Sequence, residues 1–146
     1  MDDHGRALRA DQWRDRWATE LSATAIDLAP YRMLLESALA YAGGTHTVED
    51  VERLIADGHA QFWPGPHSCV ITEFDAQPRK KTLSIFLAAG DMAELEAMEP
   101  GIMAWGREQG CVAARFVGRR GWERSFLKRM GWVNTNIVVM EKSLDG

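Results

Sequence analysis

The sequence predicts a mixed α/β fold, and three observations support this class. Segments with apolar residues at helical spacing alternate with short apolar or alternating runs that are typical of strands. Their order is helices, strands, helix, strand, helix and strand. The strand-like runs TLSIFLAAG and CVAARFVG are separated by one helical segment, which favours parallel neighbours joined by a right-handed crossover. Because the earlier strands read as an antiparallel meander, we expect a mixed, mostly antiparallel sheet flanked by helices.

The composition fits one globular domain. The chain has 146 residues, of which 46% are hydrophobic and 26% are charged, enough to build a respectable core. A net charge of −4 argues against general nucleic-acid binding, although a local basic face remains open. The sequence shows no signal peptide and no apolar run long enough to cross a membrane, so we expect a cytoplasmic protein.

The N-terminal segment predicts a helical arm, residues 1–25, outside a domain that spans residues 26–146. Trp13, Trp17 and Leu21 recur at i, i+4 and i+8 and form one stripe of a helix. Two interpretations stay open for this stripe: the tryptophans pack on the chain's own domain, or the arm docks on a protein partner.

Two more helices are expected before the sheet. In the first, Pro30 lies in the first turn, where proline is tolerated, and Gly43 and Gly44 end the helix. In the second, Thr47 caps the N-terminus and Asp50 stands at the third position after it, an arrangement like a capping box.

Strands follow at AQFW, SCVITEFD and TLSIFLAAG, the last apolar enough to be central. Strand alternation places Cys69, Ile71 and Glu73 on one face of SCVITEFD. Pro100 and Gly101 interrupt the next helical segment, so a kink or two short helices are expected there. CVAARFVG is a further strand, GWERSFLKRM a short helix closed by Gly131, and WVNTNIVVMEKSL the last strand.

This order of elements resembles the GNAT (Gcn5-related N-acetyltransferase) fold, and more closely a group of small GNAT-like proteins of phage and prophage genomes. The resemblance rests on HTVEDVERLIADGHAQFW, VITEFDAQPRKKTLSIFLAAGDMAELEAM, IMAWGREQGC, GRRGWERSFLKRMGW and VVMEKSL, which cover most of residues 46–144. It implies a single GNAT-like domain, with acetyl-CoA as the cofactor if the chain is an enzyme.

The resemblance places the acetyl-CoA pyrophosphate at Ala89, Gly90, Asp91 and Met92. The family holds this group on backbone N–H donors at a helix start, in a loop with the pattern Q/R-x-x-G-x-G/A. Here the corresponding stretch reads AAGDMAELEAM, which keeps Gly90 but not the rest of the pattern. Asp91, Glu94 and Glu96 add negative charge where the family binds phosphates, although Asp91 also suits a simple helix cap.

Two further features bear on whether the chain is an enzyme. Many GNAT enzymes carry a tyrosine that protonates the departing thiolate, whereas Phe126 and Leu127 stand at the matching positions and cannot donate a proton. Glu73 lies near the place where such enzymes keep a carboxylate base, but it also fits a solvent-facing strand residue.

A basic cluster near the C-terminus is the candidate binding surface. Its predicted partner-binding residues are Arg119, Arg120, Arg124 and Lys128. CoA phosphates, a nucleic-acid backbone, an acidic protein surface including the chain's own residues 91–99, and plain solvation all remain open as their role.

We expect no metal site, because His46, His59 and His67 are spread out and belong to no His/Cys cluster. Cys69 and Cys111 are expected to be buried thiols. The leading hypothesis is a non-catalytic GNAT-like domain that binds a protein partner, in a phage particle or its assembly, in the bacterial host cytoplasm or the virion. The alternative is an acetyl-CoA-dependent N-acetyltransferase with a divergent phosphate-binding loop.

Overall fold

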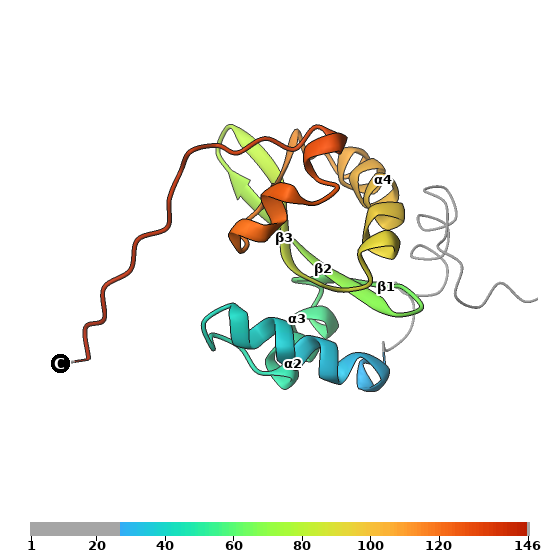
Figure 1. Ribbon diagram of the computed structural model, residues 1–146, viewed down its shortest axis with the longest axis vertical. Helices are drawn as coiled ribbons and strands as arrows, with labels where there is room; N and C mark the ends of the chain where they lie inside the picture. The colour runs from blue at the N-terminus through green and yellow to red at the C-terminus, as the bar shows by residue number, and fades with distance from the viewer. Residues whose placement is uncertain (1–26, 146) are drawn as a thin grey trace, which may run out of the picture.

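The computed structural model describes residues 27–145, in which a four-stranded sheet with the order β1-β2-β3-β4 carries helices on both faces (Figure 1). The predicted arm with Trp13 and Trp17 lies outside the described residues. The elements are η2 (Ala29–Tyr31), α2 (Arg32–Tyr41), α3 (Val48–Ala56), β1 (Gln61–Pro64), β2 (Ser68–Gln77), β3 (Lys80–Gly90), α4 (Met92–Glu108), β4 (Ala113–Phe116), η3 (Arg120–Arg124) and η4 (Lys128–Met130).

The strand pairing confirms the predicted mixed, mostly antiparallel sheet. β1 pairs with β2 and β2 with β3 in antiparallel register, while β3 pairs with β4 in parallel. The parallel pair is joined through α4, as expected for a strand–helix–strand crossover. β3 is therefore central, and β1 and β4 are the edges.

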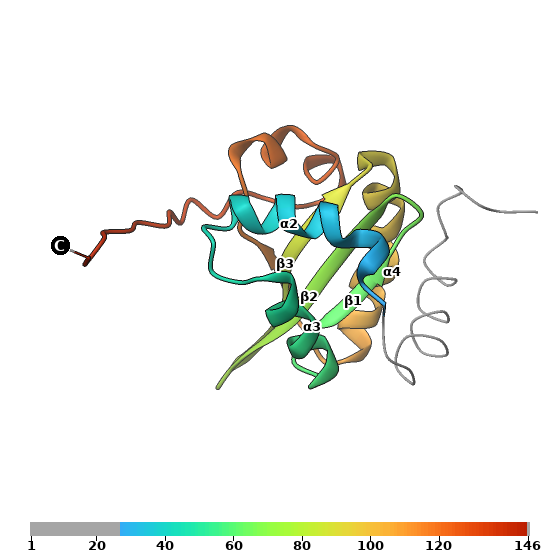
Figure 2. The ribbon, with the colours of Figure 1, turned by 90° about the horizontal axis from the view of Figure 1, so that it is seen from below.

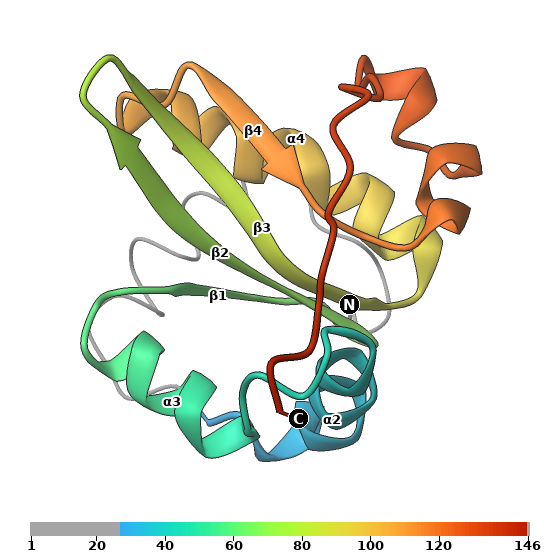
Figure 3. The ribbon, with the colours of Figure 1, turned by 90° about the vertical axis from the view of Figure 1, so that its left-hand side faces the viewer.

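Helices cover both faces of the sheet (Figures 2 and 3), and each face has its own apolar core. On one face, α2 and α3 pack over β1, β2 and the end of β3, with Leu35, Val51 and Ile71 fully buried. On the other, α4 and the chain after β4 pack over β2 and β3, around Trp63, Leu83 and Met98. Cys69 and Ile71 lie in the first core and Val70 in the second, which confirms the predicted alternation in β2.

One irregularity in β3 changes which side chains share a face. Ile71 is opposite Leu87 while Thr72 is opposite Ile85, so Phe86 is an extra residue in β3. Phe86 and Leu87 both contact the core under α2 and α3, whereas Ile85 and Ala88 both face α4. The bulge thus brings Ile85 and Ala88 onto one surface, although they are three positions apart.

The helix ends follow local sequence signals. Thr47 Oγ1 accepts the Asp50 backbone N–H at 3.1 Å, and Asp50 Oδ2 accepts the Thr47 N–H at 2.9 Å, so the predicted capping box of α3 is confirmed. The hydrogen bond from the Thr47 N–H, and after it the one from Arg53, lowers the pKa of the Asp50 carboxyl by favouring its charged form.

Of the two alternatives predicted at Pro100, a kink or two short helices, the second is wrong. α4 runs without interruption from Met92 to Glu108 with Pro100 inside it. Pro100 is exposed, while Gly101, Ile102 and Trp105 are buried against the sheet. Pro100 has no backbone N–H and so lacks one helical hydrogen bond. Packing of the buried face against the sheet stabilises the helix on both sides of this position.

Two predictions after β4 are also wrong. The expected helix over residues 121–130 is replaced by the short η3 and η4, because Ser125 Oγ donates to Trp122 O at 2.7 Å and accepts Leu127 N–H at 3.2 Å. These local bonds compete with helical ones. The expected last strand, residues 132–144, belongs to no helix or strand and runs away from the sheet (Figure 1). An isolated strand has no partner for its backbone groups, so it cannot form a ladder alone.

Candidate functional site

The junction between β3 and α4 is where the resemblance places a phosphate-binding loop. Gly90 is the last residue of β3 and Met92 the first of α4, so only Asp91 lies between them. Asp91 Oδ1 accepts the Glu94 backbone N–H at 3.1 Å and caps the helix. The connection between strand and helix is therefore one residue long, and the Asp91 side chain already accepts one of the backbone N–H groups of the first helical turn.

Gly90 serves a close approach between strands. Its φ of +118° is one that L side chains rarely adopt, and a Cβ there would lie 2.4 Å from the His67 carbonyl oxygen. The glycine therefore lets the end of β3 pass against the start of β2. That role explains Gly90 without any ligand.

A buried carboxylate lies beneath the first turn of α4. Glu94 accepts hydrogen bonds from the His67 backbone N–H at 2.8 Å and from Ser68 Oγ at 2.6 Å, and its Oε2 lies 3.0 Å from His67 Nδ1. Its relative exposure is 6%. Glu94 therefore ties the β1–β2 turn to the first turn of α4, which Asp91 caps. Its tertiary role was missed from the sequence, because its partners are distant along the chain.

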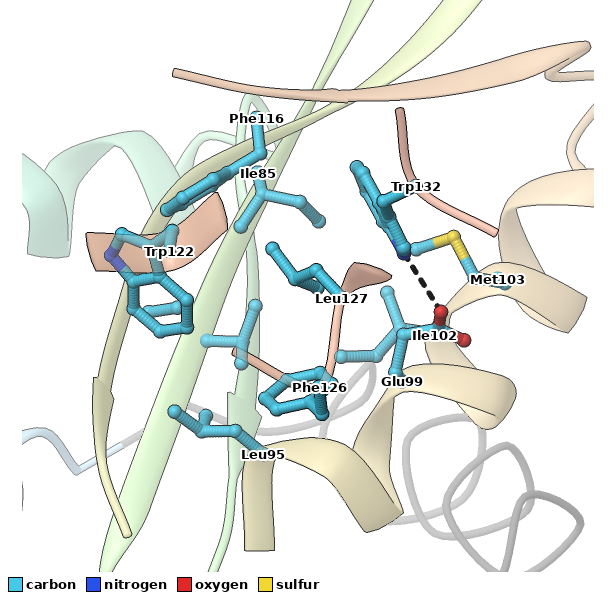
Figure 4. Close-up of a pocket in the computed structure, with 12 residues that line it drawn as sticks. Ile85, Leu95, Glu99, Ile102, Met103, Phe116, Trp122, Phe126, Leu127 and Trp132 are labelled. Carbon is cyan, nitrogen blue, oxygen red and sulfur yellow. Dashed lines mark hydrogen bonds between the residues drawn. The ribbon is translucent and has the colours of Figure 1, made fainter. Parts of the chain in front are cut away.

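Beyond Ile85, β3 is open on the side away from β2. β4 pairs only with Thr82–Ile85, and no described strand continues that ladder toward Gly90. An apolar cavity of about 40 Å³ lies beside this open stretch (Figure 4). That volume suits a group of a few heavy atoms. It is lined by Val70, Ile85, Ala88, Leu95, Glu99, Ile102, Met103, Phe116, Trp122, Phe126, Leu127 and Trp132.

Aromatic side chains from the chain after β4 form one side of this cavity (Figure 4). Phe126 is buried, and Trp122 packs edge-on to Phe116 with ring centroids 5.0 Å apart. Phe126 and Leu127, which stand where the resemblance expects a tyrosine, thus pack against α4 and β3. Glu99 is the carboxylate in the lining and accepts the Trp132 indole N–H at 2.8 Å. Sequence reasoning missed Glu99, because no local pattern indicates that it faces the same space as Trp122 and Phe126.

Glu73 is not part of this cavity. It is half-buried on β2 opposite Ser84, whereas Gly90 pairs with Ser68. The distance from Ser68 to Glu73 along β2 is roughly 17 Å at about 3.4 Å per residue. Val70 lines the cavity, so alternation puts Glu73 on the opposite face of the sheet. The structure therefore does not bring together the predicted base and the residues Ala89–Met92.

The predicted basic surface is exposed around η3 and η4. Arg119 lies over the ring of Tyr41, 3.9 Å from its centroid, and links this region to α2. The neighbouring Arg129 pairs with Glu96 at 2.7 Å, which is the internal pairing with residues 91–99 that the sequence left open. Within residues 27–145, Arg120, Arg124 and Lys128 form no ion pair, so their charge is available to other molecules.

The thiols and histidines add no second site. Burial raises the pKa of Cys69 to about 12, which keeps it a protonated core thiol as predicted. Cys111 was predicted to be buried but is only half-buried, and burial raises its pKa as well. In the part of the chain that the structure describes, no three His, Cys, Asp or Glu side chains gather to hold a metal ion. None of the described helices is long and apolar enough to span a membrane.

Solved structures share a similar fold with this chain, and three are compared by TM-score, identity and coverage. Wild-type TTHA1254 from Thermus thermophilus superposes with a TM-score of 0.58 and 14% identity, over 84% of this chain and 97% of that one. A point mutant of the same protein gives 0.56 and 14%, over 77% and 92%. The ribosomal-protein-alanine N-acetyltransferase from Brucella melitensis biovar Abortus 2308 gives 0.56 and 12%, over 93% and 96%.

No protein-family profile matches the sequence, and no curated protein matches it. At these low identities the structural likeness establishes the fold and leaves function open. The chain has a GNAT-like fold, with a mixed α/β sheet flanked by helices.

Proposed function

We propose that this chain is a GNAT-like domain that binds a protein partner and does not transfer acetyl groups. The observation that carries the proposal is the β3–α4 junction, where Asp91 alone connects strand and helix and caps the helix. The resemblance to small phage and prophage proteins gives the proposal its specific form: a component of a virion or of its assembly, made in the cytoplasm of a bacterial host.

Charge at the junction opposes a phosphate ligand. A helix N-terminus attracts anions through its free N–H groups and its partial positive charge. Here Asp91 occupies the Glu94 N–H, and the Glu94 carboxylate is held beside the same turn. A pyrophosphate placed there would meet two carboxylates instead of a ring of donors. The same two side chains stabilise the helix and the adjacent turn.

The exposed basic residues suit an acidic protein surface. Arg119, Arg120, Arg124 and Lys128 lie together around η3 and η4, in a chain whose net charge is −4. Arg119 is held by stacking on Tyr41, so part of the surface is preorganised. Trp13 and Trp17 add a second candidate contact, although they lie outside the described residues.

Acetyl-CoA binding, measured by calorimetry on the full chain at low salt, tests the proposal. We expect no heat of binding and no thermal stabilisation at millimolar acetyl-CoA. Asp91→Asn, which keeps the cap and removes the charge, is the matched variant. Weak binding by this variant alone would show that charge, more than loop length, excludes the ligand. Micromolar one-to-one binding by the unaltered chain would overturn the proposal.

An acetyltransferase with a divergent site is the second candidate, and one observation favours it. The open side of β3 beyond Ile85 adjoins a cavity of about 40 Å³, which suits a group as small as acetyl. An extended ligand lying along β3 would reach both Ala88 and the α4 N-terminus. Transfer of labelled acetyl groups to a panel of peptide amines, lost in Ala88→Trp, would establish this candidate in place of the first.

A further inference from the structure

The C-terminal segment, Thr135–Leu144, is an extended apolar stretch without a sheet. It leaves the domain and points away from it (Figures 1 and 2). Its large apolar side chains are almost fully exposed: Ile137 71%, Val138 73%, Val139 76%, Met140 87% and Leu144 89%. Because four of them are consecutive, both faces of the stretch are apolar, which is the pattern of a strand covered on both sides.

The sheet offers an edge of matching chemistry. β4 is the last strand in the sheet order, and within residues 27–145 its outer side pairs with no strand. Val112 and Val117, which flank it on either side, are 73% and 68% exposed. Unpaired edges of this kind recruit other strands unless something covers them. One chain thus carries both an unpaired strand-forming segment and an unpaired edge.

The base of the segment is fixed, so the segment projects in a defined direction. The Trp132 N–H donates to Leu127 O at 3.1 Å, and its indole N–H donates to Glu99. The Asn134 amide donates to Glu123 at 2.8 Å. Asn136 follows with a positive φ of 61°, at the start of the segment that leaves the domain. From this anchor a strand of about ten residues reaches roughly 33 Å.

We infer that Thr135–Leu144 pairs with the outer edge of β4 in a second copy of this chain, and that the exchange is reciprocal. Each copy then gives one strand and receives one, which closes a two-fold dimer and leaves no β4 edge open. Charge supports the pairing, since exposed Arg115 in β4 can meet exposed Glu141 in the segment. The inference does not depend on whether the chain binds acetyl-CoA.

Light scattering after gel filtration of the full chain tests this exchange. We expect a dimer at tens of micromolar, and a monomer for Val138→Lys with Val139→Lys. Both valines are exposed in the single chain, so the lysines leave each domain folded, which circular dichroism verifies. Glu52→Lys with Asp57→Lys, on and just after α3, is the matched control and should remain dimeric. A monomeric unaltered chain, or a dimer that survives the valine changes, would overturn the inference.

Crosslinking identifies the edge that the strand occupies. In a Cys111→Ser background, chains with Arg115→Cys and differently tagged chains with Glu141→Cys, the pair that the proposed register places opposite each other, are co-expressed and oxidised. We expect a disulfide-linked heterodimer, and none when Glu52→Cys replaces Arg115→Cys. A chain that carries Arg115→Cys and Glu141→Cys together tests whether the segment folds back on its own domain: a disulfide-closed monomer from that chain would exclude exchange.

Discussion

At the scale of single residues, Glu94 shows how a carboxylate can be structural at a position where the resemblance suggests ligand binding. It is buried and accepts hydrogen bonds from the His67 N–H and Ser68 Oγ, and Gly65 leaves room for it, since a Cβ at Gly65 would lie 2.9 Å from its Oε1. The Tyr31 hydroxyl donates to the Gly65 carbonyl at 3.0 Å, so the network extends to η2.

Glu94→Gln replaces one accepting oxygen with an NH₂ group that faces donors. We expect the free energy of unfolding to fall by about 1–3 kcal/mol, because a buried donor then lacks its acceptor. Urea unfolding followed by tryptophan fluorescence measures it. Glu96→Gln, the same change at a half-exposed position that pairs with Arg129, should cost under about 1 kcal/mol. Equal losses in both variants would show that the Glu94 network contributes little.

The importance of Glu94 was not predictable from the chain, whereas that of Cys69 was. Cys69 lies inside an apolar run, and strand alternation alone buries it. Glu94 sits at a helix start, where an exposed acidic residue is the ordinary expectation. Its partners at positions 67 and 68 reach it only after β2 and β3 pair, because that register brings Ser68 against Gly90.

At the scale of elements, the β3–α4 connection depends on Gly90, which combines an unusual backbone conformation with a close contact. Gly90→Ala would place a Cβ 2.4 Å from His67 O at a φ of +118°. We expect a loss of more than about 2 kcal/mol in unfolding free energy, from strain and displaced backbone together. Urea unfolding measures this loss.

Gly110→Ala is the control for the Gly90 substitution. Gly110 also has a positive φ, +90°, but its Cβ would meet no atom within 4 Å. Gly110→Ala should lower the free energy of unfolding by about 1–2 kcal/mol, the cost of the backbone conformation alone. If the two variants lost the same free energy, the close approach at Gly90 would not matter.

Elements with a local cause were predictable, and those with a competing or distant cause were not. The α3 capping box involves only Thr47 and Asp50, which are three residues apart, so it could be predicted from the sequence. The predicted helix after β4 does not form because Ser125 takes up bonds that a helix would use. α4 survives Pro100 through packing against the sheet, and the bulge at Phe86 depends on pairing with β2.

At the scale of the whole molecule, the described domain completes two cores without its C-terminal segment. Both clusters of buried side chains are built from residues 28–126. The stretch NIVVM is strand-forming by composition, since it is mostly apolar and β-branched, but its partner was not predictable. A sequence pattern indicates which side chains share a face of a strand. It does not indicate which strand, or which copy of the chain, pairs with that strand.

If that ladder comes from a second copy, stability depends on concentration. Unfolding a dimer releases two chains, so mass action raises the midpoint as protein concentration increases. For the full chain we expect the thermal midpoint to rise by a few degrees per tenfold increase in concentration. A chain ending at Asn134 keeps the hydrogen bonds of Trp132 and Asn134 and both cores. Its thermal midpoint should therefore not change with protein concentration. Circular dichroism melts at 2, 20 and 200 μM, roughly spanning the expected dimer range, compare the two chains. A concentration-dependent midpoint in the shortened chain would place the contact between copies elsewhere on the domain.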